Sequence, residues 1–360
     1  FKKINLFINL YYNSKSYLSK LFFFLKEGGL SLDINMLRLP LSNINNNQDI
    51  DIRIKERDFF DTIVNKFISD FFPKILYSNN NLKNLFILKK NIKSLSSSIA
   101  LISYDDYRIL ASLVGKIKVN TYQHGSDYDS LKYNFIDKFE KSYSNFFSWK
   151  NKKSFNLFFE KIKNKKSNQL INHDKKKKKI TFFSTIHYHN ILRYEAPHID
   201  FKSNLDSIRN AAFFYNSLKD SLKKEFIIRN KQHNYGWKYK KIFYKYSSNK
   251  NLVKFYNSES SLEAMKNSKI FITDHISTSF YEALQLNIPM LVFCDINKYI
   301  FTNKVQKAFL LLRKNNIIFD NQVSCSKFLN NNYDDIIKIW TSKDVQNSLK
   351  NFKNIVFNRL

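Results

Sequence analysis

The second half of the sequence alternates short apolar runs with longer amphipathic segments, and this alternation restricts the fold more than any other feature. Four apolar runs are predicted strands, "KITFFST" (179–185), "EFIIRN" (225–230), "KIFITD" (269–274) and "IPMLVF" (288–293). Between them lie predicted helices at 204–222, at 260–268, which opens with a Ser260–Glu263 capping box, and at 277–287. Such alternation is typical of right-handed crossover units, so we predict a doubly wound parallel sheet.

The first half carries weaker signals of the same class. Apolar residues recur at helical spacing in 59–76 and 105–115, while the runs at 85–88 and 118–123 are predicted strands. The segment 129–150 is predicted to be helical throughout, and the last 25 residues are predicted to be helix with Trp340 on the apolar side. The pattern therefore favours a second α/β domain ahead of the first.

A run of five lysines in "NHDKKKKKI" (172–180) separates these two regions. Like charges repel one another and are usually solvated linker. We predict an N-terminal Rossmann-like domain at 1–170, a linker at 171–179, a C-terminal Rossmann-like domain at 180–332 and a helical segment at 333–360. The chain starts at Phe1 rather than Met, so we expect the N-terminal domain to lack its beginning. Ligands of such sheets bind beyond the carboxyl ends of the strands, in this case at a cleft between two domains.

The charge is strongly positive but does not resemble that of a nucleic-acid reader. The formal charge is +30, and the basic residues comprise 51 Lys and only 9 Arg. Base and phosphate recognition favours Arg because its guanidinium binds with two parallel hydrogen bonds. The abundance of Lys, Asn, Ile, Phe and Tyr is also what a strong A+T bias in the coding DNA would produce. A basic nucleic-acid-binding protein that uses the lysine run remains the alternative from another class.

Several common chemistries are excluded by scarce residue types. The five glycines, Gly28, Gly29, Gly115, Gly125 and Gly236, are not spaced for a P-loop, a G-x-G-x-x-G turn or a G-x-S-x-G elbow. Two cysteines, Cys294 and Cys325, provide no CxxC pair, zinc cluster or disulfide framework, which favours a reducing compartment. No apolar run approaches the roughly 18 residues of a membrane-spanning helix.

The stretch "QHGSDYD" (123–129) places a His and a Gly directly after a predicted strand. Gly125 permits a tight turn, for which we expect a positive φ, and leaves His124 near the strand end, where it can act as a base at neutral pH. Asp127 is the competing candidate for this role. The structural alternative is a histidine that caps or packs in the core.

Two further clusters follow predicted strands in the second half. Arg229 can bind a phosphate with two hydrogen bonds, and its alternative is a surface ion pair. Ser277, Thr278 and Ser279 begin a predicted helix, where hydroxyls and backbone N–H groups suit an anion. Glu282 lies one turn later and can hold ribose hydroxyls, although Ser279 and Glu282 also match a capping box.

Taken in order, these segments resemble a family of transferases from bacterial surface-carbohydrate loci. That family is distantly similar to the CDP-glycerol glycerophosphotransferases and to glycosyltransferases of the two-Rossmann (GT-B) fold. The similarity covers most of the chain and includes "QHGSDYD", "DKFEKSYSNFFSW", "ITFFST" with "RYEAP", "RNKQHNYGW", "DHISTSFYEALQLNIPMLVF" and "IIKIWTSKDVQ". The chain departs from the family in the loop after His124, where Gly-Gly-x-Tyr-Gly is usual, and at Asn234, where an acidic residue is usual.

The resemblance implies a GT-B-like protein whose two Rossmann-like domains face each other across a cleft, with a C-terminal helix that crosses back onto the N-terminal domain. It implies that His124, Gly125 and Asp127 form an acceptor-side catalytic loop. The implied donor-binding residues are Arg229, Asn234, Tyr235, Gly236, Asp274, Ser277, Thr278, Ser279 and Glu282.

The implied reaction transfers a sugar or polyol-phosphate unit from a nucleotide-activated donor to a bacterial surface glycan or lipid-linked acceptor. We expect no bound cofactor and no metal, because a basic cleft can neutralise a leaving diphosphate. We expect a cytoplasmic enzyme in peripheral contact with an anionic membrane, and no nucleic-acid partner. A nucleotide-sugar epimerase of the same fold is the alternative within this class.

Overall fold

In a computed structural model of the protein, the described residues are 4–8, 29–32, 92–98, 101, 111–112, 118–125, 128–152, 179–184, 201–229, 236–248, 253–255 and 260–357. The predicted helix at 59–76, the predicted strand at 85–88 and most of the predicted linker lie outside them. The chain divides into two compact units. The first unit comprises Phe1–His124 with Lys138–Phe147, and the second comprises Gly125–Asp137 with Ser148–Leu360.

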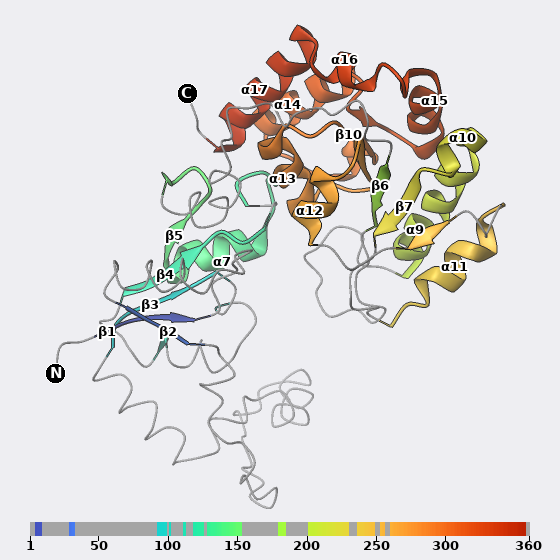
Figure 1. The fold of residues 1–360 in the computed structure, drawn as a ribbon. Helices are drawn as coiled ribbons and strands as arrows, with labels where there is room; N and C mark the ends of the chain where they lie inside the picture. The colour runs from blue at the N-terminus through green and yellow to red at the C-terminus, as the bar shows by residue number, and fades with distance from the viewer. Residues whose placement is uncertain are drawn as a thin grey trace, which may run out of the picture. The chain divides into compact units, whose positions relative to one another are not determined.

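The first unit contains a five-stranded parallel sheet in the order β2-β1-β3-β4-β5 (Figure 1). Its strands are β1 (Ile4–Ile8), β2 (Gly29–Leu32), β3 (Ile92–Ser97), β4 (Lys118–Tyr122) and β5 (Asn145–Phe147). Helix α7 (Phe135–Tyr143) begins after Asn134, whose side-chain oxygen accepts a hydrogen bond from the Asp137 N–H. The prediction of continuous helix over 129–150 is wrong at both ends. Before α7, Leu131 forms a β-bridge with Phe301, and after α7, β5 pairs with β4 and Phe147 stacks on Tyr122 at 5.0 Å.

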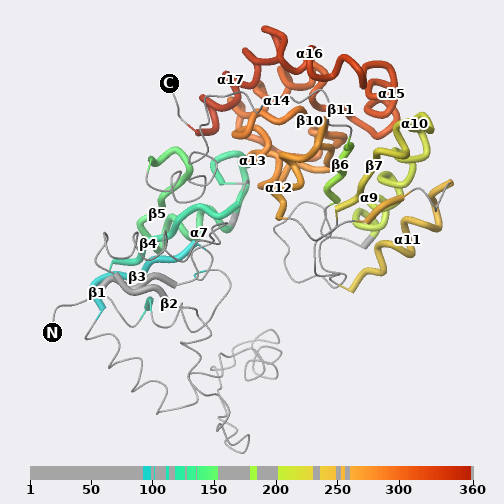
Figure 2. Tube along the Cα trace, in the orientation of Figure 1, coloured from blue at the N-terminus to red at the C-terminus, as the bar shows by residue number. Residues whose placement is uncertain are grey.

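The second unit contains a six-stranded parallel sheet in the order β11-β10-β9-β6-β7-β8 (Figure 2). Its strands are β6 (Ile180–Phe183), β7 (Phe226–Arg229), β8 (Lys254–Phe255), β9 (Ile270–Thr273), β10 (Met290–Phe293) and β11 (Ile318–Phe319). Counted along the chain within this unit, the order is 3-2-1-4-5-6, which is that of the dinucleotide-binding Rossmann fold. The predicted doubly wound parallel sheet is confirmed.

Both faces of the second sheet are covered by helices, which explains why its central strands are mostly apolar on both sides. On β9, Phe271 belongs to one hydrophobic cluster, whereas Ile270 and Ile272 belong to the other. The helices of the Phe271 side are α12 (Ser261–Lys266), α13 (Thr278–Leu286), α14 (Asn303–Lys314) and α17 (Lys343–Phe357). Those of the opposite side are α9 (Phe201–Asn216), α10 (Asp220–Lys223), α11 (Tyr239–Tyr246) and α15 (Gln322–Asn332). The predicted capping box of Ser260 and Glu263 is confirmed at the start of α12.

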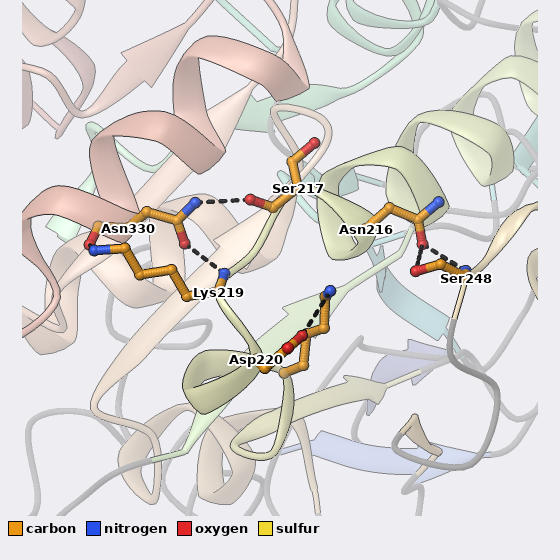
Figure 3. Close-up of polar contacts among 7 residues, drawn as sticks. Asn216, Ser217, Lys219, Asp220, Ser248 and Asn330 are labelled. Carbon is orange, nitrogen blue, oxygen red and sulfur yellow. Dashed lines mark hydrogen bonds and ion pairs between the residues drawn. The ribbon is translucent and has the colours of Figure 1, made fainter.

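The helix predicted at 204–222 is interrupted, and a side chain from α15 holds the break (Figure 3). The Asn330 amide donates from Nδ2 to the Ser217 carbonyl at 2.7 Å and accepts at Oδ1 from the Lys219 N–H at 2.9 Å. Asn216, the last residue of α9, contacts the end of α11 instead. Its amide donates to the Tyr246 carbonyl at 2.8 Å and accepts from the Ser248 N–H at 2.7 Å. The Asn330 side chain therefore satisfies backbone groups at the break after α9, and the Asn216 side chain satisfies backbone groups at the end of α11.

The C-terminal helices are integrated into the second unit. In α16 (Ile336–Trp340), Trp340 donates through Nε1 to the Asn287 carbonyl at 3.2 Å, and α17 buries Val345, Leu349 and Phe352. These apolar side chains are buried within the C-terminal α/β unit, and the packing of this segment onto the first unit stays a prediction. No helix among the described residues is long and apolar enough to cross a membrane.

Candidate functional site

The carboxyl edge of the second sheet gathers polar residues at the point where the strand order reverses. The reversal lies between β6 and β9, and open sheets of this order bind ligands outside such a point. Phe183, the last residue of β6, is paired with Arg229 on β7 and with Thr273 on β9, so the residues that follow these strands lie at one level. The Arg229 guanidinium carbon lies 5.1 Å from the centroid of the Phe183 ring, a cation–π contact that holds Arg229 over this edge.

The loop that leaves β9 is organised by the Asp274 carboxylate, whose side chain is only 4% exposed. Its Oδ1 lies 2.9 Å from His275 Nδ1, and its Oδ2 accepts a hydrogen bond from the Ser207 hydroxyl of α9. The Thr273 hydroxyl lies 3.1 Å from the same His275 nitrogen. A carboxylate can only accept, so His275 Nδ1 is the donor in this contact.

The start of α13 has hydroxyl groups that do not cap the helix. Ser277 is the N-cap, with φ −133° and ψ −176°, yet its side chain makes no capping hydrogen bond and instead lies 2.7 Å from the Ser279 hydroxyl. Ser279 lies inside the helix, so the alternative of a Ser279–Glu282 capping box is wrong. Glu282 is buried within α13, at 6% exposure. The hydroxyl pair and the helix N-terminus together suit an anionic group.

Negative charge lies on one side of this edge and influences buried groups there. Burial, with a contribution from Asp274, raises the pKa of the Tyr239 phenol far above its usual value. Burial also raises the pKa of the Cys294 thiol, and the neighbouring carboxylates of Asp274, Asp295 and Asp320 raise it further. Asp295 is engaged as the N-cap of a short helical turn at Ile296–Lys298, and Asp320 is paired with Arg313. The cationic side of the edge is therefore at β7, where Arg229 stands.

In the first unit, His124 follows the carboxyl end of β4, as predicted. The Gln123 N–H donates to the Phe147 carbonyl at 3.0 Å, which continues the β4–β5 pairing up to the residue before His124. The expectation of a positive φ at Gly125 is wrong, and a Cβ there would meet only Tyr128 Cε2 at 3.9 Å. Left-handed geometry occurs instead at Asp129, with φ 57°, and at Gly236, with φ 86°.

The structure brings together Arg229, Asp274 and Ser277–Ser279 around one sheet edge, and it places Gly236 just before the buried Trp237. Asp127, Asn234 and Tyr235 lie outside the described residues. Sequence reasoning missed His275 and Ser207. The position of His275 between a predicted strand and a predicted helix was a usable signal, whereas nothing local marks Ser207, which is 67 positions from Asp274. Among the described residues no group of three His, Cys, Asp or Glu side chains could hold a metal ion.

These features define a class, a two-unit α/β protein whose second unit has Rossmann topology and an anion-suited edge at its switch point. The chain belongs to the LIC12162 family of transferases, whose profile matches residues 1–357, and it is therefore a transferase. No curated protein matches the sequence.

Solved structures resemble the chain at low sequence identity. MurG from Acinetobacter baumannii aligns with 99% of this chain and 100% of its own, at 11% identity and a TM-score of 0.44. The UDP-GlcNAc 2-epimerase from Neisseria meningitidis, bound to UDP-GlcNAc, aligns over 100% of both chains at 13% identity and a TM-score of 0.46. A UDP-glucose:anthocyanidin 3-O-glucosyltransferase in complex with UDP covers 99% of this chain and 95% of its own, at 11% identity and a TM-score of 0.40.

Proposed function

We propose that this transferase moves a sugar or polyol-phosphate unit from a nucleotide-activated donor to a bacterial surface glycan or lipid-linked acceptor. The second unit binds the donor at the switch point of its sheet. Two observations support this assignment: Arg229 ends β7 and the Ser277–Ser279 hydroxyl pair begins α13, and both positions belong to the carboxyl edge of one sheet. Both suit the phosphates of a nucleoside diphosphate.

The donor nucleotide extends from these phosphates along α13. Glu282, one turn into that helix, is assigned to the ribose hydroxyls, because a carboxylate accepts hydrogen bonds from both. Asp274 does not contact the donor in this proposal, because both of its oxygens are used by His275 and Ser207. It positions His275 and the loop that leads to Ser277.

The acceptor hydroxyl is activated in the first unit by His124, for which the end of β4 provides a fixed position. A positioned proton acceptor contributes roughly 10²- to 10⁴-fold to a rate. The arginine and the helix N-terminus neutralise the leaving diphosphate, so the proposed reaction needs no metal ion or bound cofactor.

Binding of UDP, CDP and GDP, measured by calorimetry, tests the donor site. The Ser277→Ala, Ser279→Ala double variant should lose about 1–3 kcal/mol of binding free energy, the range for hydrogen bonds to charged groups. Ser217→Ala with Ser221→Ala removes two exposed hydroxyls elsewhere and is the matched control. If none of the nucleotides binds, or if both double variants bind equally well, the donor site is not here.

The acceptor side is tested by turnover. His124→Ala should reduce kcat by roughly 10² to 10⁴ and leave nucleotide affinity near wild type. A fully active His124→Ala enzyme would end the catalytic role of His124, and abolition of turnover by Asp127→Ala but not by His124→Ala would assign that role to Asp127. Incubation of an active donor without acceptor completes the set, because formation of an isomer would identify an epimerase.

A further inference from the structure

One surface of the second unit combines exposed apolar side chains with lysines. We call it the α14 face and define it by Lys132, Tyr133, Ile300, Lys304, Lys307, Leu310, Leu311 and Lys314, all of them exposed. The described part of the chain exposes seven large hydrophobic side chains, and four of them are here: Tyr133 (65%), Ile300 (59%), Leu310 (45%) and Leu311 (37%). This concentration separates the α14 face from an ordinary surface with scattered apolar residues.

The helical geometry of α14 explains how its own members of the face come to share one side. Val305, Ala308, Phe309 and Leu312 are buried and face the core. At 3.6 residues per turn, Lys304, Lys307, Leu310, Leu311 and Lys314 occupy the opposite arc of about 120°. One side of the helix is therefore apolar and packs on the core, while its solvent-exposed side carries two leucines between lysines.

A short backbone pairing adds the remaining members of the face. Leu131 and Phe301 form an antiparallel bridge, the Lys132 N–H donates to the Ile300 carbonyl at 2.7 Å, and the Thr302 N–H donates to the Ser130 carbonyl at 2.9 Å. Leu131 and Phe301 pack inward, so Lys132 and Ile300 point outward. The Lys132 ammonium lies 5.4 Å from the centroid of the Tyr133 ring.

The charged members of the α14 face are all lysines. Between Ile296 and Phe319 the sequence has five basic residues, Lys298, Lys304, Lys307, Arg313 and Lys314, and no Asp or Glu. Lysines bury their aliphatic stems beside apolar groups and keep the ammonium at the level of lipid headgroups, while tyrosine prefers the same interface. Nucleic acid would be served by the lysines but gains nothing from exposed leucines and isoleucine.

We propose that the α14 face docks on an anionic phospholipid surface, with Leu310, Leu311, Ile300 and Tyr133 entering the headgroup boundary and the lysines contacting lipid phosphates. The proposal extends the proposed function by naming the surface on which a lipid-linked acceptor would be met. Vesicle binding does not require turnover, so it can succeed or fail independently of the transferase assignment.

Co-sedimentation of the full chain with vesicles tests the proposal. Phosphatidylcholine vesicles containing 30% phosphatidylglycerol should bind the protein, binding should weaken in high salt, and pure phosphatidylcholine should bind much less. Lys307→Gln with Lys314→Gln should weaken binding about 25-fold, since each interfacial lysine contributes roughly fivefold. Leu310→Ser with Leu311→Ser should weaken it about tenfold or more.

The matched controls lie outside the α14 face. Phe213→Ser with Val323→Ser removes two comparably exposed apolar side chains, and Lys327→Gln with Lys338→Gln removes two exposed charges. Both should bind vesicles like wild type. Tryptophan fluorescence establishes that each variant is folded. If the leucine variant fails to fold, the lysine variant still tests the proposal, because it changes no apolar packing.

Three results would overturn the proposal. The first is absence of wild-type binding to the anionic vesicles, or equal losses in the controls. The second is tight binding of a single-stranded oligonucleotide that the lysine variant loses and the leucine variant keeps, while the leucine variant binds vesicles as well as the wild type does. The third is a wild-type dimer in sedimentation velocity that the leucine variant converts to monomer, which would make the α14 face a self-association surface.

Discussion

Replacement of Asp274 by alanine should destabilise the second unit substantially. Only 4% of the Asp274 side chain is exposed, and its carboxylate accepts hydrogen bonds from the Ser207 hydroxyl and from His275 Nδ1. The alanine variant leaves both donors, which are partly buried near the sheet edge, without that acceptor. A buried donor without a partner costs about 1–3 kcal/mol, and two of them therefore cost roughly 2–6 kcal/mol.

Two effects reduce this sum. Removing a buried carboxylate returns part of its desolvation cost, and the Thr273 hydroxyl, 3.1 Å from His275 Nδ1, can accept one of the released hydrogen bonds. We therefore expect Asp274→Ala to lower the free energy of unfolding by about 2–4 kcal/mol. Asp274→Asn should lose less than about 1 kcal/mol, because the amide can accept from His275 and donate to the Ser207 oxygen.

Urea unfolding followed by tryptophan fluorescence is the appropriate assay. The three tryptophans of the chain, Trp149, Trp237 and Trp340, are all buried in the second unit, so the signal reports that unit alone. Asp206→Ala is the matched control, because Asp206 lies on the same helix as Ser207 but is half-exposed in a surface pair with Arg209. Surface pairs contribute little.

The reasoning would be refuted if Asp274→Ala lost no more stability than Asp206→Ala. Nitrogen-15 spectra of labelled histidine give an independent check. The wild-type His275 ring should carry its proton on Nδ1, and Asp274→Ala should abolish that preference. A wild-type ring protonated at Nε2 alone would contradict the hydrogen-bond assignment.

Three further predictions concern the second unit. Asn330→Ala removes the two side-chain hydrogen bonds to Ser217 and Lys219 (Figure 3) and should lower the free energy of unfolding in urea by about 1–2 kcal/mol. Asn331→Ala, on the exposed side of the same helix, should leave that free energy nearly unchanged, and equal losses in the two variants would contradict a stabilising role of the Asn330 hydrogen bonds. Trp149 is 1% exposed and packs against Tyr281 and Phe357. Trp149→Ala should lower the free energy of unfolding, followed by circular dichroism, by about 3–5 kcal/mol, and a loss below about 1 kcal/mol would contradict that packing. Burial raises the pKa of both cysteine thiols, so the native protein should not react with a thiol reagent at pH 8. Its free energy of unfolding should fall as pH rises above about 8.5, because only the thiols of the unfolded chain ionise there. The Cys294→Ala, Cys325→Ala double variant should show a smaller fall, and an unchanged fall would assign the pH dependence to other groups.

The secondary structure of the second unit was largely predictable, because a strand covered on both faces must be apolar along its length and the helices between must be amphipathic. The runs around Phe182, Ile228, Ile272 and Val292 are all central strands. Around β5 the prediction failed, since apolar spacing in 129–150 is compatible with either element and pairing with β4 decided for a strand.

The candidate site was predictable only where its residues stand at strand ends. Arg229 and Ser277 could be found because parallel strands bring their carboxyl ends to one edge. Their neighbours in the chain, however, did not reveal that Ser277 leaves the helix uncapped and bonds to Ser279, or that Gly125 needs no left-handed geometry. Those outcomes depend on local hydrogen bonds that compete within less than about 2 kcal/mol.

By itself the amino-acid sequence determined the class of fold, because hydrophobic periodicity is a local property that each element shows independently of the others. The strand order, the pairing of Ser207 with Asp274 across 67 positions and the asparagine clamp on the break after α9 were decided by tertiary structure alone. Such contacts join residues that are distant in sequence, and a buried polar group selects its partner from whatever folding brings within hydrogen-bond distance. The orientation of His275, and with it the shape of the proposed donor site, was set at that level.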